Sequence, residues 1–279
     1  GGAILDMYSK CGCIEDAQHI FNILPKKDLV TWGTIISGYA GTDGFRALGM
    51  YESMQETGIK PDKSVYASIL KACAQVKSTI LGFLIHDQVV KEGFHLDLVV
   101  GTALVDMYSQ FANLECAQKI FYQLPEVNEI SWGVLIKGYV QHGAEEFAFS
   151  LYEKMRQKRF RPNKATYGCL LQGCSNIGVL AQGRIIHDRI VRDELESDDV
   201  IGSLIVEFYA QCGCFEEAHF VFDKLPNCDN MAWGALLYGY MRNGCEDYVY
   251  KLFELMELKG ENSDVFIFMC VLKACGTLH

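Results

Sequence analysis

The sequence predicts an all-α protein, a right-handed superhelical solenoid of helix-turn-helix repeats. Three observations support this prediction. The three tryptophans, Trp32, Trp132 and Trp233, lie 100 and 101 residues apart, and a glycine follows each of them. Within each period, apolar residues recur at the spacing of an amphipathic helix, and the alternation typical of strands is absent. An internal period of this kind is the signature of a repeat array.

The long period divides into shorter units. Leu-Pro at residues 24, 124 and 225 recurs at the same interval as the tryptophans, and Ile-His-Asp at residues 85 and 186 recurs likewise. The first period is one residue short near residues 41–44, where a turn can lose a residue. We therefore predict one array over residues 1–279, with repeats 1–28, 29–62, 63–97, 98–128, 129–163, 164–198, 199–229, 230–264 and a partial unit 265–279.

Each unit is expected to form two helices, as the unit 129–163 illustrates. Pro162 stops the second helix, and Gly143 between the two helices suits a left-handed cap. The first apolar stripe is Trp132, Leu135, Ile136 and Tyr139, and the second is Phe147, Leu151 and Met155. One such hairpin cannot bury both faces, so neighbouring hairpins must stack to complete the core. The chain starts and ends inside a unit, so we expect it to be part of a longer array.

Composition excludes several classes of protein. Half of the residues are hydrophobic and 22% are charged, as in a packed globular protein. No apolar run approaches the length of a membrane span, and no signal peptide is visible. The net charge of −10 disfavours a broad electrostatic grip on nucleic acid, although a groove can differ locally. Most of the 12 cysteines are interpreted as reduced core residues.

The repeat units resemble the pentatricopeptide repeat family, in its plant-type form with alternating short, standard and long repeats (PLS). Residues 4–12 resemble the short repeat. Residues 32–39, with Gly-Ile-Lys-Pro-Asp at 58–62, resemble the standard repeat, and residues 69–73 with Ile85-His86 resemble the long repeat. The resemblance covers the whole chain. It implies recognition of single-stranded RNA at one base per repeat, without a cofactor.

The resemblance also implies which residues contact RNA. In this family the fifth and last residues of a repeat select the base, and the apolar second residue packs on the base faces. The fifth/last pairs are Gly2/Asp28, Gly33/Asp62, Ala67/Asp97, Thr102/Asn128, Gly133/Asn163, Gly168/Asp198, Ser203/Asp229 and Gly234/Asp264. The base-packing residues include Val30, Val99, Ile130, Val200 and Met231.

Some of these positions depart from the family pattern. The three standard repeats have glycine at the fifth position, which leaves no side chain to bond a base. Only two fifth/last pairs, Thr102/Asn128 and Ser203/Asp229, match residue combinations that select a base in this family. A protein-interaction scaffold that holds a peptide or an accessory factor in its groove therefore stays open as the alternative to RNA binding.

The sequence also has patterns that could suggest other chemistry. Cys-Gly-Cys at 11–13 and 212–214 lacks the spacing of a zinc site, and we expect packing and turn roles instead. His86 and His187 are expected to pack between helices, and the tryptophans to pack in the core. The basic run 154–161 closes a helix, where positive charge is favoured, but a phosphate contact is the alternative.

The resemblance implies a role in a mitochondrion or chloroplast, in RNA editing, splicing or transcript maturation. The resemblance then implies accessory editing-factor proteins as further partners. It implies no membrane partner. Many members of this subclass carry a C-terminal deaminase-like domain with His-x-Glu and Cys-x-x-Cys motifs. Neither motif occurs in these 279 residues, so the chain is not expected to be an enzyme.

Overall fold

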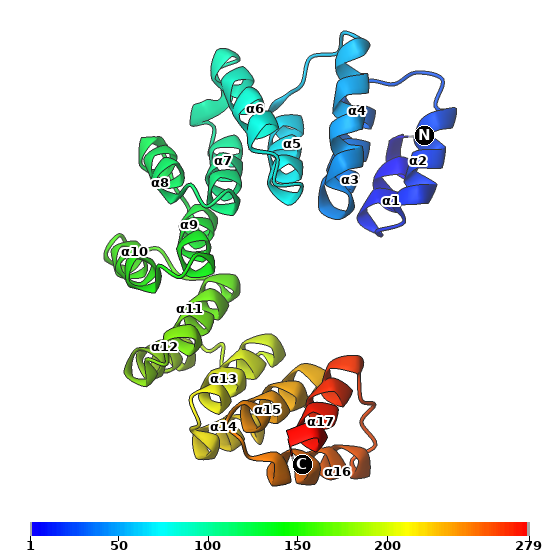
Figure 1. The fold of residues 1–279 in the computed structure, drawn as a ribbon. Helices are drawn as coiled ribbons and strands as arrows, with labels where there is room; N and C mark the ends of the chain where they lie inside the picture. The colour runs from blue at the N-terminus through cyan, green and yellow to red at the C-terminus, as the bar shows by residue number, and fades with distance from the viewer. Residues whose placement is uncertain (1, 278–279) are drawn as a thin grey trace. The chain divides into compact units, whose positions relative to one another are not determined.

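The computed structural model describes residues 2–277. Every regular element among these residues is a helix: 17 α-helices and one short 3-10 helix (Figure 1). The prediction of an all-α helical repeat protein is therefore confirmed. The chain forms two compact units, residues 2–142 and residues 143–277. The boundary falls in the turn between the two helices of the repeat 129–163.

The first unit contains α1 to α9. The second helix of each hairpin follows the first after a short turn, and η1 links α6 to α7. The bounds are α1 (Gly2–Lys10), α2 (Ile14–Ile23), α3 (Leu29–Thr42), α4 (Gly44–Glu56), α5 (Lys63–Gln75), α6 (Thr79–Lys91), η1 (Phe94–Leu96), α7 (Leu98–Gln110), α8 (Leu114–Gln123) and α9 (Glu129–Gln141).

The second unit contains α10 to α17, and it is built in the same way. Its bounds are α10 (Glu145–Gln157), α11 (Lys164–Ile177), α12 (Leu180–Arg192), α13 (Asp199–Gln211), α14 (Phe215–Phe222), α15 (Asn230–Arg242), α16 (Glu246–Leu258) and α17 (Val265–Thr277). From α3 onward, the first helix of every predicted repeat begins at the first residue of that repeat.

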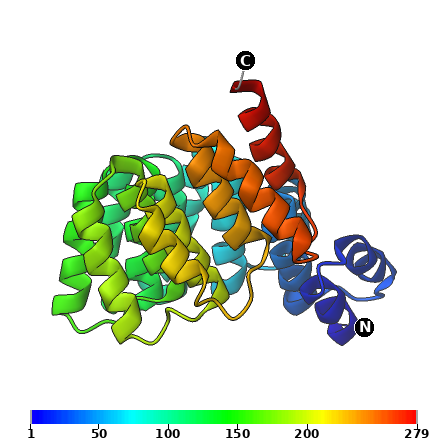
Figure 2. The ribbon, with the colours of Figure 1, turned by 90° about the horizontal axis from the view of Figure 1, so that it is seen from below.

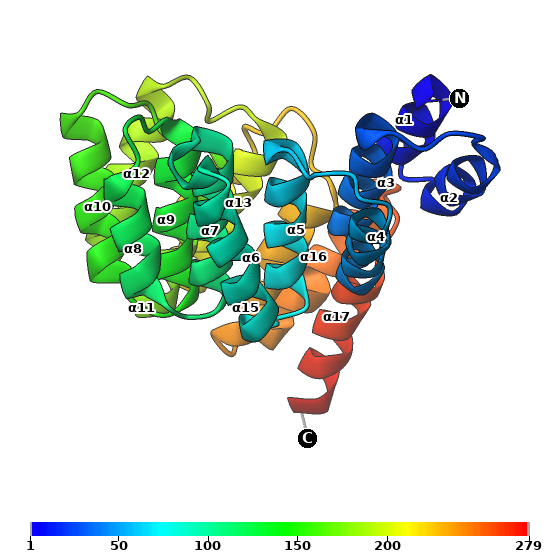
Figure 3. The same cartoon turned by 90° about the horizontal axis from the view of Figure 1, so that it is seen from above.

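Within each unit the helices form two layers. The odd-numbered helices pack side by side, α1 through α9 in the first unit and α11 through α17 in the second. The even-numbered helices cover one side of that layer, and most pack against both their own partner and the next odd-numbered helix. Views from below and above show the same alternation within each unit (Figures 2 and 3). One face of each odd-numbered layer thus stays uncovered.

The tryptophans anchor the core, as predicted. Trp32, Trp132 and Trp233 are at most 4% exposed. Each indole meets the edge of a phenylalanine ring from the preceding helix, with ring centroids 4.7 to 4.8 Å apart. Edge-to-face pairs of this kind stabilise a core beyond the area that they bury. The same contact therefore recurs in the repeats 29–62, 129–163 and 230–264.

Small residues let neighbouring odd-numbered helices approach closely. A Cβ atom on Gly38, Gly138 or Gly239 would lie 2.3 to 2.5 Å from a side-chain atom of Ser9, Ser109 or Ala210 in the preceding odd-numbered helix. Such a distance is far below van der Waals contact. Glycine is required here for helix spacing, whereas Gly143 is required for its turn: its φ of +69° confirms the predicted left-handed cap.

Among the described residues, no helix has both the length and the apolar character that crossing a lipid bilayer requires.

Candidate functional site

The last residue of each repeat lies at the N-cap of the next odd-numbered helix. In every case the side-chain Oδ1 atom accepts a hydrogen bond from a backbone N–H two or three residues later. Asp28 and Asn128 form complete capping boxes with Thr31 and Ser131. The last-position residues therefore stabilise the fold, whatever they do to a ligand. This capping role was not predicted above, although Asp or Asn directly before an apolar helix is its usual signal.

Capping by itself does not decide whether Asp or Asn stands at the last position of a repeat. The two side chains are about equally good N-caps. Capping uses Oδ1, so they differ in the remaining atom, which is an accepting Oδ2 in Asp and a donating Nδ2 in Asn. That atom is what a base could meet at Asp62, Asn128, Asn163 or Asp229.

In the repeats 63–97 and 164–198 a lysine already pairs with this remaining atom. Lys63 lies 3.0 Å from Oδ2 of Asp97, and Lys164 makes the equivalent ion pair with Asp198. The hydrogen bond from Lys164 lowers the pKa of Asp198 below its ordinary value, and the helix N–H of Ile201 acts in the same direction. Burial raises the pKa of Asp97, but Lys63 and the helix amides outweigh it, so the net shift is downward.

Replacing Lys164 by glutamine is expected to bring the pKa of Asp198 back toward its ordinary value. A carboxyl with a lowered folded-state pKa stabilises the fold above its unfolded pKa of about 3.9, and this stabilisation is lost as the pH falls through the folded value. The variant should lose less than about 1 kcal/mol at pH 7, because the pair is partly exposed. Its urea stability should also fall less steeply than wild type below about pH 5. Lys60→Gln is the control, and identical pH profiles of wild type and Lys164→Gln would contradict the assignment.

The fifth-position residues differ in how far solvent can reach them. Thr102, Gly33, Gly133, Ala67 and Gly168 are half-buried, and Gly2 is exposed.

Two fifth-position residues are buried. Ser203 is 1% exposed, and its hydroxyl donates to the carbonyl oxygen of Asp199 at 2.8 Å. The proton of this hydroxyl is therefore used one turn back in its own helix, while the role of Ser203 toward a base stays a prediction. Gly234 is also buried.

The predicted base-packing residues are all exposed apolar side chains. Val30, Val99, Ile130, Val200 and Met231 are 43% to 72% exposed, and each lies in the first turn of an odd-numbered helix, beside the capping residue. Val99 and Ile130 belong to adjacent repeats, as do Val200 and Met231, whereas the repeats 63–97 and 164–198 have Ser64 and Ala165 at this position. Exposed apolar side chains of this kind are able to contact flat apolar faces. Their role toward a base stays a prediction.

One repeat brings its three predicted contact residues into a single cavity. A cavity of about 440 Å³ is lined by the second, fifth and last residues of the repeat 230–264, namely Met231, Gly234 and Asp264. Phe266 closes it from α17, and its ring centroid lies 5.9 Å from that of Tyr238. We call this cavity the α15–α17 slot.

Phe266 was not among the residues predicted to contact a base, although it is the second residue of the partial unit 265–279. Glu207 of α13 also lines the slot, and burial raises the pKa of its carboxyl. Aromatic rings and carboxyl groups in one cavity offer both a stacking surface and hydrogen-bond acceptors.

His86 and His187 each bond the hydroxyl group of a tyrosine on the next helix. His86 bonds the hydroxyl of Tyr108 at 2.7 Å, and His187 bonds Tyr209 at 2.9 Å. Both contacts join an even-numbered helix to the next odd-numbered one, which confirms the packing role predicted for these histidines. Burial lowers the pKa of both histidines. In the part of the chain that the structure describes, no three His, Cys, Asp or Glu side chains cluster as metal ligands would.

Chelation is expected to leave the purified chain unchanged. Cys13 and Cys214 each direct the thiol toward the backbone carbonyl two residues earlier, in turns rather than toward a common centre. A tetrahedral zinc site needs four ligands around one point. Thermal melting with and without EDTA, together with elemental analysis, checks this expectation. Stoichiometric zinc or a lower melting temperature in EDTA would contradict it.

Comparison with known proteins gives consistent matches along the chain. A family model described as the PPR repeat matches residues 2–29 and 231–261, and one described as the PPR repeat family matches residues 127–176. The chain is 32% identical over 281 residues to the Arabidopsis thaliana "Pentatricopeptide repeat-containing protein At4g18520, chloroplastic", covering 100% of this chain and 45% of that protein. It is 32% identical over 275 residues to the "Putative pentatricopeptide repeat-containing protein At3g13770, mitochondrial" of the same plant, covering 98% and 44%.

A solved structure shares the fold. The crystal structure of the pentatricopeptide repeat protein PPR10 from maize matches with a TM-score of 0.60 at 16% identity, over 98% of this chain and 46% of that one. The chain thus spans less than half the length of these proteins.

Proposed function

Because this chain belongs to the pentatricopeptide repeat family, we propose that it binds single-stranded RNA with the uncovered face of its odd-numbered helices. In this proposal the last-position residues and the exposed second-position residues meet the bases, one base per repeat. The chain acts as a binding module and carries out no catalysis itself. Its RNA targets lie in a mitochondrion or chloroplast, where it serves editing, splicing or transcript maturation, with accessory proteins as further partners.

The α15–α17 slot is the observation that supports this proposal best. Met231 and Phe266, the second-position residues of two successive repeats, both line the slot, and so does Asp264. Aromatic stacking on a base face is tolerant of sequence, and a carboxylate accepts from base amino groups. A Cβ atom on Gly234 would lie 3.2 Å from the ring of Phe266, so a glycine at the fifth position lets this ring pack closely against α15.

Sequencing the RNA that this chain selects from a randomised pool tests the proposal. By the family's code Thr102/Asn128 favours adenine and Ser203/Asp229 favours guanine, three repeats further along. We therefore expect A-N-N-G in the selected RNA. Each of these two pairs should favour its preferred base over the other bases by about 1–3 kcal/mol at best. Because the hydroxyl of Ser203 is used within α13, the guanine preference should be the weaker of the two.

Replacing Asn128 by Asp should move the first preferred base from adenine toward guanine. The change alters only the hydrogen-bonding pattern of the remaining side-chain atom, while the N-cap of α9 is kept. The melting temperature should therefore stay within about 2 °C of wild type. Asn128→Ala is the matched control, since it removes both the cap and the base contact. A selection that returns no purine at that spacing, or an unchanged preference in Asn128→Asp, would contradict the code.

The alternative function is a protein-interaction scaffold. The net charge of −10 and the fifth-position glycines favour it, since neither helps to hold a polyanion. Under this alternative the exposed apolar second positions pack on a peptide. The randomised RNA pool separates the two functions, because a scaffold would enrich no sequence.

A further inference from the structure

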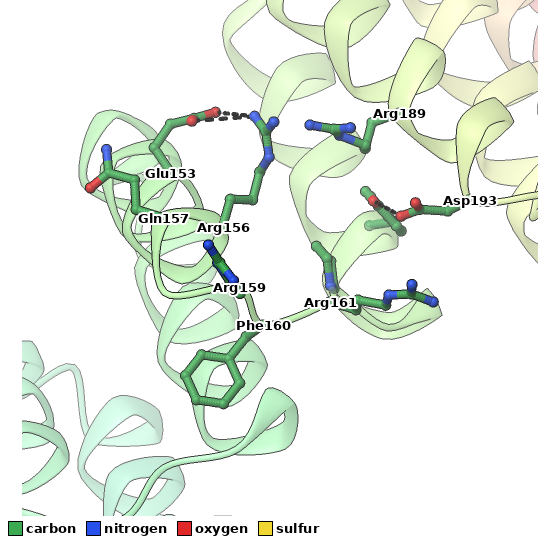
Figure 4. Close-up of a pocket in the computed structure, with 10 residues that line it drawn as sticks. Glu153, Arg156, Gln157, Arg159, Phe160, Arg161, Arg189 and Asp193 are labelled. Carbon is green, nitrogen blue, oxygen red and sulfur yellow. Dashed lines mark hydrogen bonds and ion pairs between the residues drawn. The ribbon is translucent and has the colours of Figure 1, made fainter.

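A second cavity, on another part of the second unit, gathers four arginines. It measures about 370 Å³ and lies between the C-terminal end of α10, the loop before α11, and α12 (Figure 4). Figure 4 shows Arg156 and Arg189 reaching toward the same space from α10 and α12. Arg159 and Arg161 line it from the loop. We call this cavity the arginine pocket.

Most of this positive charge is not balanced by neighbouring carboxylates. Arg156 pairs with Glu153 at 3.1 Å. Within residues 2–277, none of the ion pairs involves Arg159, Arg161 or Arg189. Asp193 lines the pocket too, but one of its oxygens already accepts from the hydroxyl of Tyr167 at 2.5 Å. The pocket therefore has four guanidinium groups against two carboxylates, in a chain whose net charge is −10.

At residues 156, 159 and 161 arginine occurs only in the second period, although the counterpart of Arg161 in the first period is Lys60. In the first period, Gln55 and Gln88 stand where the second has Arg156 and Arg189. There they form a neutral network: Tyr51 donates to Gln88 at 2.8 Å, and Gln55 donates to Tyr51 at 3.0 Å. The third period has glutamate and asparagine, at residues 257 and 262, in place of Arg156 and Arg161. The repeat fold therefore does not require the arginines.

One of the four arginines is held in a conformation that favours glycine. Arg159 has a φ of +64°, whereas its counterparts in the other standard repeats are Gly58 and Gly260, with φ of +76° and +77°. A side chain at such a φ is strained relative to glycine. Lys77, Ala112 and Glu194 have the same kind of conformation outside the pocket, so the strain by itself does not mark the site. A guanidinium thus stands where glycine would be less strained.

We propose that the arginine pocket binds a phosphate group. The planar fork of arginine matches the oxygens of a phosphate in bidentate hydrogen bonds, and several guanidiniums around one space need an anion to offset their repulsion. The source is either the backbone of an RNA strand or a small phosphate compound. Arg161 lies two residues before Asn163, so the pocket adjoins the edge where the last-position residues lie. The proposal does not depend on how bases are read.

Three variants of the whole 279-residue chain test this proposal. Arg159→Gly removes a guanidinium and relieves the backbone strain, so a loss of binding cannot be attributed to unfolding. Arg189→Gln introduces the residue that the first period has at this place. Lys77→Gly is the matched control: Lys77 also has a positive φ, of 53°, and it lies outside the pocket.

Two probes distinguish the source of the phosphate. Pyrophosphate is titrated by calorimetry, and a fluorescein-labelled single-stranded RNA 20-mer by anisotropy over a series of KCl concentrations. Arg159→Gly and Arg189→Gln should each weaken binding of at least one probe by about tenfold, while Lys77→Gly should stay near wild type. If the RNA backbone is the source, the salt slope should fall by about 0.7 for each lost contact.

Loss of pyrophosphate binding alone would support the proposal with a small phosphate compound as the source. That result would stand even if wild type bound no RNA and the proposed function failed. Unchanged affinities of both pocket variants for both probes would overturn the proposal. An equal loss of affinity in Lys77→Gly would also overturn the proposal. That result would mean that binding depends on the net charge of the chain and not on the arginine pocket.

Discussion

Replacing Trp233 by alanine is expected to lower the free energy of unfolding by about 3–5 kcal/mol. The indole is 0% exposed, and it meets the edge of Phe222 at a centroid distance of 4.8 Å. Its removal takes apolar area out of the core and leaves a cavity between α14 and α15, which a stack of helices cannot easily close. Urea denaturation followed by circular dichroism measures the loss.

Two control variants separate burial from the other properties of Trp233. Trp233→Phe should cost clearly less than alanine, because a ring remains to fill most of the space. The indole N–H is buried without a hydrogen-bond partner among the described residues, so losing it removes no bond. Leu258→Ala, at an 84% exposed position in the same unit, should change the stability by less than about 0.5 kcal/mol. If Trp233→Ala cost no more than Leu258→Ala, the core assignment would be wrong.

Replacing Phe266 by alanine is expected to weaken binding of the selected RNA by about ten- to a hundredfold, since stacking of one base on an aromatic ring contributes about 1–3 kcal/mol. The prediction depends on the proposed RNA function and on the α15–α17 slot. Phe266 lines that slot and is 46% exposed, so truncation should remove a ligand contact with little effect on the core. Fluorescence anisotropy with the selected RNA measures the change.

Phe268 is a matched control for this prediction. It lies on the same helix and is 48% exposed, but it packs near Phe253 of α16, at a centroid distance of 5.9 Å, rather than lining the slot. Phe268→Ala should therefore leave RNA affinity within about twofold of wild type, as expected for a position away from the ligand. Equal losses in the two variants would mean that α17 contributes through its folding and not through the slot.

The period and the helices were predictable from the sequence because both depend on local information. The spacing of Trp132, Leu135, Ile136 and Tyr139 defines one face of a helix wherever that helix finally packs. Gly143 and Pro162 limit the helices through backbone geometry that involves only their own neighbours. The burial of the tryptophans and the packing role of His86 and His187 were also predictable from the sequence. An apolar stripe that recurs in every unit must pack against a neighbouring unit, and these residues recur with it.

The site depended on distances between residues far apart in the chain, which periodicity does not contain. The burial of Ser203 is set by how closely α13 packs within its layer, and its hydroxyl donates within its own helix. The ion pairs of Lys63 with Asp97 and Lys164 with Asp198 join residues 34 apart. The α15–α17 slot is lined by residues of three successive odd-numbered helices, and Arg189 lies near Arg156 only because α12 and the end of α10 line one cavity. A sequence period states which residues are equivalent from repeat to repeat, but only the packing of successive repeats decides which of them share a cavity.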